Sequence, residues 1–164
     1  MKTLLVLRHA KSSWNESGLA DHDRPLNERG ERDAPRVGKL LRQQRLAPGV
    51  IISSDAVRAR MTARAVAEAA GFTGEIRLEP LLYAAAPDDI MVVLRAAPEP
   101  NTANVLIVGH NPGLEALVRQ LTGERHDLPT AALAQIDLPI ERWRDLDEST
   151  TGTLVGLWRP KELE

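Results

Sequence analysis

Short apolar runs alternate along the chain with longer segments in which apolar positions recur at helical spacing. The runs 3–7, 50–52, 76–78 and 104–108 predict buried strands, and the runs 132–138 and 153–158 predict two further strands whose direction the pattern leaves open. The segments between them predict helices over about 27–45, 54–71, 87–97 and 112–121. This alternation predicts one α/β domain over residues 1–164 with a largely parallel sheet.

Capping residues place the expected ends of these helices. Asn27 and Ser54 are predicted N-caps, and Gly71 is predicted to end the helix that Ser54 begins. Pro112 suits the opening turn of the last helix. Pro35 falls inside the first helix, which we expect it to bend or to start late.

Composition and charge exclude several classes of function. The net charge of −2 predicts no general affinity for nucleic acid or for acidic lipid. The chain has no cysteine, so disulfides, thiolate nucleophiles and cysteine metal sites are excluded. The apolar run that stops at Arg8 is too short for a signal sequence, and no segment reaches the length of a membrane span. We therefore expect a cytoplasmic protein without a membrane partner.

Two histidines follow predicted strands, His9 after the first and His110 after the strand 104–108. Groups at the carboxyl ends of strands in an open α/β sheet meet in one crevice, so the two side chains are expected to share a site. Arg8 adds a guanidinium fork suited to phosphate oxygens. Arg58 lies near the start of a predicted helix, where an anion would bind.

These residue types indicate phosphoryl transfer. Neutral imidazole is a good nucleophile near neutral pH, and a phosphorylated imidazole can be hydrolysed in a second step. Arginine side chains stabilise the charge on the non-bridging oxygens. The histidines lack metal-ligand spacing, so we expect neither a metal nor another cofactor.

Several segments together resemble the histidine phosphatase (phosphoglycerate mutase-like) superfamily. Arg8-His9-Ala10 is similar to the Arg-His-Gly signature, with alanine in the glycine position, and the stretch 8–15 resembles the mutase form Arg-His-Gly-Glu-Ser-x-Trp-Asn. Residues 53–63 resemble Ser-Ser-Pro-x-x-Arg-Ala-x-x-Thr-Ala, and Gly109-His110 matches the late Gly-His. The compact length and the stretch 108–113 look most like the small SixA-type phosphohistidine phosphatases.

The resemblance implies a fold and a set of roles. The fold would be a three-layer α/β/α sandwich with a mostly parallel central sheet. His9 would become phosphorylated, and Arg8, Arg58 and His110 would bind the phosphoryl group. The substrate-binding positions that carry over less directly are Ser12, Asn15 and Arg24.

The resemblance leaves the proton donor and the substrate open. Larger members carry a glutamate after the third strand, and Glu79 is the nearby candidate. A site without a good acid suits phosphohistidine, because imidazole leaves far more easily than an alkoxide. We therefore expect a phosphatase that acts on phosphohistidine in a protein.

Other interpretations remain. A phosphatase of small phosphate esters such as sugar phosphates or nucleotides is the main alternative, and a non-catalytic phosphate-binding module is a third. The chain is short for the capping segments that a mutase needs, and the sequence does not indicate an oligomeric state. Ser12 and Asn15 are equally consistent with loop hydrogen bonding. Trp14 is expected to pack, whereas His22 and His126 are expected to be exposed.

Overall fold

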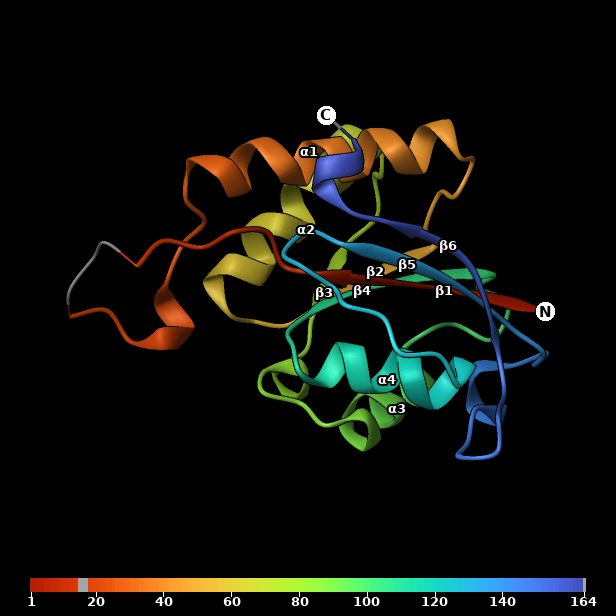
Figure 1. Cartoon of the computed structure of the whole chain (residues 1–164). Helices are drawn as coiled ribbons and strands as arrows, with labels where there is room; N and C mark the ends of the chain where they lie inside the picture. Colours follow the sequence, from red (N-terminus) through yellow and green to blue (C-terminus); the bar gives the residue numbers. More distant parts are fainter. Residues whose placement is uncertain (15–17, 164) are drawn as a thin grey trace.

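The computed structural model describes residues 1–14 and 18–163, and its strands form one mixed sheet between two layers of helices (Figure 1). The strand order is β3-β2-β4-β1-β5-β6. The strands are β1 (Lys2–Arg8), β2 (Val50–Ser53), β3 (Ile76–Leu78), β4 (Asn104–Gly109), β5 (Leu133–Leu138) and β6 (Thr153–Trp158). β5 pairs antiparallel with both of its neighbours, whereas the pairs β1–β4, β2–β4 and β2–β3 are parallel. The predicted, mostly parallel α/β/α sandwich is confirmed, and the direction of its last two strands is now defined.

Two helices cover each face of the sheet. α1 (Glu28–Gln43) and α2 (Val57–Ala70) lie together on one face, and α3 (Pro87–Ala96) and α4 (Gly113–Thr122) lie on the other (Figure 1). Within the described residues, no helix combines the length and the apolar character that crossing a membrane requires.

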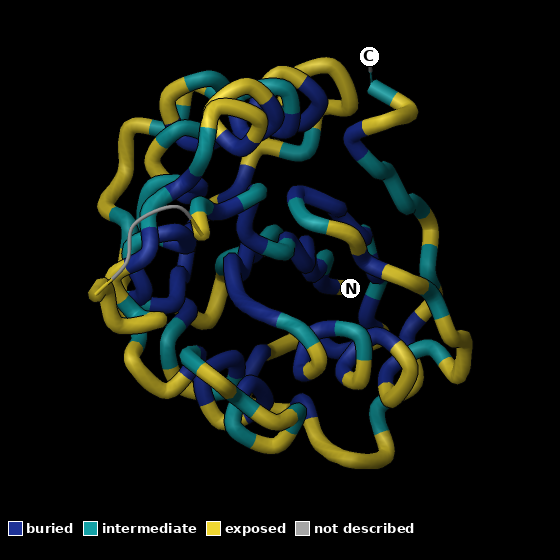
Figure 2. Tube along the Cα trace, turned by 60° about the vertical axis from the view of Figure 1, so that its left-hand side comes forward, coloured by how far each residue is buried: buried dark blue, intermediate teal, exposed yellow. Residues whose placement is uncertain are grey.

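The sheet is buried on both faces because each central strand contains a run of consecutive apolar residues. In β1, Leu5 and Leu7 pack with the core under α1 and α2, whereas Leu4 and Val6 pack with the core under α3 and α4. Consecutive side chains of a strand point to opposite faces, so a continuous apolar run supplies both cores. Figure 2 shows this buried backbone inside an outer shell of exposed loops and helix faces.

The predicted N-cap of α1 is confirmed, whereas the predicted N-cap of α2 is not. The Asn27 side chain accepts the N–H of Gly30 at 2.9 Å, so its predicted role as a cap is confirmed, and α1 begins at Glu28 without delay despite Pro35. The predicted cap at Ser54 is wrong, because α2 begins only after Ala56. The backbone N–H of Ser54 still donates to the Val108 carbonyl at 2.9 Å, so this residue extends the sheet contact beyond β2.

Gly30 packs α1 directly against the loop after β1. A Cβ atom at this position would lie 2.2 Å from the carbonyl oxygen of Lys11, a backbone atom that cannot move without shifting the loop. The Asn27 N–H donates to that same carbonyl at 3.0 Å, so the shift would also disturb the start of the helix.

We expect Gly30→Ala to lower the free energy of unfolding by about 1–3 kcal/mol, as overpacking does elsewhere. Urea denaturation followed by circular dichroism measures the change. Lys39→Ala on the exposed face of α1 is the control and should stay within about 0.5 kcal/mol of wild type. Equal stability of Gly30→Ala and wild type would contradict the close contact.

Candidate active site

The pairing of β1 with β4 brings the two predicted histidines together. Arg8 lies opposite Gly109 in the parallel register, so His9 and His110 leave neighbouring strands at the same level. The N–H of His9 donates to the Gly109 carbonyl at 3.0 Å, and the two imidazole centroids are 5.1 Å apart. The expectation that distant histidines share one crevice at the carboxyl ends of the strands is met.

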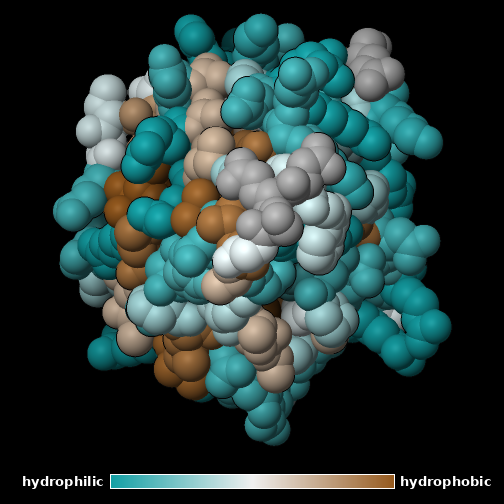
Figure 3. Space-filling model, turned by 90° about the vertical axis from the view of Figure 1, so that its left-hand side faces the viewer, coloured by the Kyte–Doolittle hydropathy of each residue, from teal (hydrophilic) through white to brown (hydrophobic). Residues whose placement is uncertain are grey.

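A cavity of about 220 Å³ opens beside these rings. It lies at the edge of the sheet where the parallel strands end, on the face shown in Figure 3. Cationic, imidazole and hydroxyl groups dominate its lining, which consists of Arg8, His9, Lys11, Ser12, Trp14, Arg24, Arg58, His110, Asn111 and Thr130. Such a small, positively charged cavity suits one tetrahedral oxyanion better than a large organic ligand.

His9 is held in the state that a nucleophile requires. Its Nδ1 lies 2.7 Å from the Ala10 carbonyl oxygen, which can only accept, so Nδ1 carries the proton and Nε2 carries the lone pair. Burial lowers the pKa of His9 to about 3, and the positive charges of Arg58 and Arg8 add to this effect against the opposing Ala10 hydrogen bond. The imidazole is therefore neutral at physiological pH.

His110 lies against the residue that follows β2. Its Nε2 is 2.8 Å from the Ser54 hydroxyl, and its Nδ1 is buried without a hydrogen-bond partner. Burial and then Arg58 lower the pKa of His110 to about 4. Neutral His110 thus leaves Arg8, Lys11, Arg24 and Arg58 as the positive charges of the cavity wall.

Arg58 is the most buried of these arginines and is held by Asp21. The Arg58 guanidinium donates to the Asp21 carbonyl at 2.6 Å and to the Asp21 carboxylate at 3.0 Å. The same carboxylate accepts from the Tyr83 hydroxyl and from Arg24. Hydrogen bonds from Tyr83 and Arg58 hold the pKa of Asp21 well below its usual range, so this carboxylate stays ionised.

Arg8 is positioned by a single backbone unit in the loop before β5. Its Nη1 donates to the Leu128 carbonyl at 3.1 Å, and the Asn111 amide donates to the same oxygen at 2.9 Å. The Leu128 N–H donates in turn to the Glu115 carboxylate at 2.7 Å. Glu115, on the first turn of α4, therefore holds the backbone of Leu128, the residue whose carbonyl accepts from Arg8.

Unpaired buried nitrogens concentrate at this site. Within the described part of the chain, five buried side-chain nitrogen or oxygen atoms lack a hydrogen-bond partner, and three of them are Arg8 Nε, Arg58 Nε and His110 Nδ1. Leaving such groups unpaired costs roughly 1–3 kcal/mol each. An anion in the cavity would add acceptors at the point where acceptors are scarce.

Of the remaining predicted site residues, two line the cavity, one lies outside the described residues and one lies away from the cavity. Ser12 and Arg24 line the cavity and are bonded to each other at 2.8 Å. Asn15 lies outside the described residues. The Glu79 carboxylate accepts the N–H of Leu81 at 3.4 Å, at the start of a 3-10 turn. Glu79 is not among the described residues that line the cavity.

The structure adds residues that the sequence did not indicate. Asp21 accepts from Arg58 and from the Tyr83 hydroxyl. His22 stacks edge-on against Tyr83, and its Nε2 lies 3.0 Å from the Asp55 carboxylate. The expectation that His22 is merely exposed is therefore wrong. These residues lie in irregular segments without a periodic pattern; the available signal was that Tyr83 is the single tyrosine of the chain.

Trp14 also differs from expectation. It is 74% exposed rather than packed, and it lines the rim of the cavity. The Arg24 guanidinium carbon lies 3.5 Å from the centroid of the indole ring, so an arginine covers one ring face in place of a hydrophobic core.

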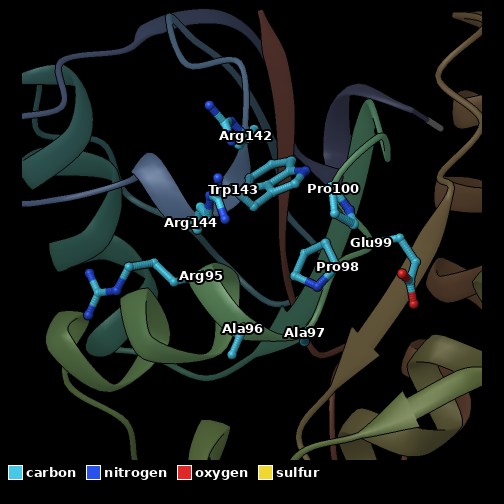
Figure 4. Close-up of a pocket in the computed structure, with 9 residues that line it drawn as sticks. All are labelled: Arg95, Ala96, Ala97, Pro98, Glu99, Pro100, Arg142, Trp143 and Arg144. Carbon is cyan, nitrogen blue, oxygen red and sulfur yellow. The ribbon is translucent and has the colours of Figure 1, made fainter.

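A second hollow, of about 390 Å³, lies at the opposite end of β4 (Figure 4). It surrounds Trp143, whose indole N–H donates to the Thr102 carbonyl at 2.8 Å. The polar ends of Arg95 and Glu99 extend away from Trp143 in different directions (Figure 4). Because these polar groups do not converge, the hollow offers no arrangement for chemistry, and we assign the candidate active site to the His9 cavity.

The described residues contain no group of three or more histidine, aspartate or glutamate side chains placed to hold a metal ion.

Comparisons with known proteins point to one family. The family model of the histidine phosphatase superfamily (branch 1) matches residues 4–83. An uncharacterized protein of Mycobacterium tuberculosis is 32% identical over 94% of this chain and 100% of its own length. A structure from Agrobacterium tumefaciens, described as a candidate phosphohistidine phosphatase SixA, is 30% identical, covers 97% of this chain and 98% of its own, and has a TM-score of 0.82. The protein histidine phosphatase SixA complexed with tungstate has the same fold, with a TM-score of 0.84 over 99% of each chain at 24% identity.

The lowered pKa of His9 predicts a loss of stability in acid. The folded protein keeps His9 neutral down to about pH 3, whereas an unfolded chain binds this proton near about pH 6.5. Protons therefore favour the unfolded state as the pH falls below about 6.5, by up to about 1.4 kcal/mol per pH unit for one such histidine.

We expect His9→Ala to reduce the loss of unfolding free energy between about pH 7 and 4.5 by about 2 kcal/mol relative to wild type. Urea denaturation at a series of pH values gives both curves. His126→Ala, which removes a partly exposed imidazole beside Glu124, is the control and should follow wild type. Parallel curves for His9→Ala and wild type would show that His9 is not held neutral by burial.

Proposed function

Because the chain belongs to the histidine phosphatase superfamily, we propose that it is a metal-independent phosphatase that removes phosphate from phosphohistidine in a protein through a phosphohistidine intermediate on His9. The observation that carries the proposal is the neutral His9 imidazole, with Nε2 free, in a cavity lined by cations and by no carboxylic acid among the described residues.

The first step transfers the phosphoryl group to His9. The Nε2 lone pair forms a bond to phosphorus as the bond to the leaving nitrogen breaks, and the leaving imidazole keeps that bonding pair. Arg8, Arg58 and His110 contact the non-bridging oxygens and stabilise their charge. Water then attacks the phosphorylated imidazole, which releases inorganic phosphate and regenerates His9.

The balance of this transfer favours a nitrogen leaving group. Phosphoryl transfer between two imidazoles exchanges one phosphorus–nitrogen bond for another, so the first step is close to energetically neutral. The departing imidazole leaves as a neutral molecule when its distant nitrogen carries a proton, which histidine binds near about pH 6.5. An alkoxide leaving group instead needs a proton from an acid in the site.

The carboxylates near the cavity support this preference. Asp21 is the carboxylate bonded to Arg58, and its pKa is held well below the usual range, so it has no proton to donate. Glu79 bonds to the backbone of its own turn. A site of this kind handles a leaving group that needs no acid better than one that does.

The decisive experiment compares substrates and variants side by side. We expect wild type to hydrolyse a phosphohistidine-bearing phosphotransfer protein, in the presence of a chelator, far faster than a panel of sugar phosphates and nucleotides. His9→Ala should lose at least about 10³-fold in kcat/KM, because the nucleophile is removed. His126→Ala should retain wild-type activity, and circular dichroism should show that both variants fold.

Turnover of small esters alone, lost in His9→Ala, would support the same mechanism but would identify a small phosphorylated metabolite as the substrate. Unchanged activity of a folded His9→Ala variant would overturn the assignment of the nucleophile.

Glu79 is tested separately as the predicted proton donor. We expect Glu79→Gln to change kcat on phosphohistidine protein and on esters by less than about twofold, because its carboxylate is bonded away from the cavity. Steady-state kinetics on both substrate classes measures this. A selective loss on esters would instead identify Glu79 as the donor and show that the site is equipped for alkoxide leaving groups.

A further inference from the structure

Trp14 is exposed where most tryptophans of a folded protein are buried. It lines the same cavity as His9, but His9 is 7% exposed and Trp14 is 74% exposed, so the first lies deep and the second lies at the rim. An exposed aromatic ring that lines this cavity is available to contact a ligand that enters it.

The ring is presented by a buried arginine rather than by a core. Arg24 is 9% exposed, stacks on the indole, and donates to the Ser12 hydroxyl at 2.8 Å and to the Ser13 carbonyl at 3.3 Å. It also donates to Asp21 at 3.1 Å, and Asp21 holds Arg58. One face of the indole is thus covered and fixed to the phosphate-binding groups, while the large exposed fraction leaves the rest of the ring open.

In-line attack decides which part of a substrate reaches this ring. The leaving group departs on the side of phosphorus opposite the attacking nitrogen, so it lies away from His9 Nε2 and toward the mouth. His9 is buried and Trp14 is exposed in the lining of the same cavity, so a leaving group on the far side of phosphorus from His9 points toward the mouth. The leaving group therefore lies at the rim, on the side where Trp14 is exposed.

From these observations, and resting on the proposed function, we infer that Trp14 is a specificity-determining residue whose exposed ring stacks on the planar leaving imidazole of phosphohistidine. Aromatic rings attract one another through their faces and edges, and a fixed ring loses little freedom on binding. A ring-less leaving group of the same bond type gains nothing from this contact. Trp14 thus selects for the leaving group and does not bind the phosphoryl group itself.

Two small substrates separate the ring from the reacting bond. N-phosphoimidazole and phosphoramidate both contain a phosphorus–nitrogen bond, but only the first has an aromatic leaving group. We expect Trp14→Ala to lower kcat/KM on N-phosphoimidazole about three- to tenfold, mainly through KM, which is the size of an aromatic pair contact. Its kcat/KM on phosphoramidate should stay within about twofold of wild type, and Trp14→Phe should recover most of the loss.

Leu19→Ala is the matched control, because it removes an exposed apolar side chain of the same loop that does not line the cavity. Leu19→Ala should leave kcat/KM unchanged on both substrates. An equal loss on both substrates in Trp14→Ala would show that the indole acts only through Arg24 on the phosphate site, and no loss on either would show that it does not contact the leaving group. Both results overturn the inference.

Failure of the proposed function has a different signature. Wild type would then hydrolyse neither phosphorus–nitrogen substrate, while esters were still turned over in a His9-dependent manner. That result would also remove the leaving imidazole on which the role of Trp14 depends. If wild type hydrolyses N-phosphoimidazole and Trp14→Ala leaves kcat/KM unchanged, the role of Trp14 is overturned while the proposed function stands.

Discussion

The parallel pairing of β1 with β4 is the constraint on which the site depends. Because Arg8 lies opposite Gly109, the next residue of each strand is a histidine, and a one-residue slip would separate His9 from His110 and turn one of them to the other face. This register is fixed by apolar side chains that pack on both faces of the sheet, at some distance from any catalytic group. The packing of the core therefore also determines where His9 and His110 lie relative to each other.

The electrostatics of the cavity follow from placing cations where water is scarce. Arg8 and Arg58 are held by backbone carbonyls and by Asp21, which leaves each Nε without a partner. The same positive charges and the same burial keep His9 neutral. One arrangement thus aims unpaired donors at a place where an anion could bind and keeps His9 unprotonated, and the negative charge of such an anion would offset the repulsion between these cations.

Much of this architecture could be predicted from the sequence because it rests on periodic patterns. The strands, the four helices and the family membership are confirmed, since buried strands and amphipathic helices leave regular apolar spacing. The pairing of His9 with His110 followed from the rule that strand ends meet at one edge. Irregular segments carry no such pattern. The contact of Asp21 with Arg58 joins residues 37 positions apart, and that of Tyr83 with Asp21 joins residues 62 apart, through loop conformations that no local spacing encodes.

The error about Ser54 shows the same limit from another side. Serine is a common N-cap residue, but the backbone N–H of Ser54 donates to β4 and its hydroxyl lies 2.8 Å from His110 Nε2. The expectation for Trp14 was wrong for a related reason. Most indole rings are buried, and only the structure shows that this ring stacks on Arg24 instead of packing in the core. In both cases a residue departs from its ordinary preference at the cavity. Such departures are expected where function rather than stability determines the placement of a residue.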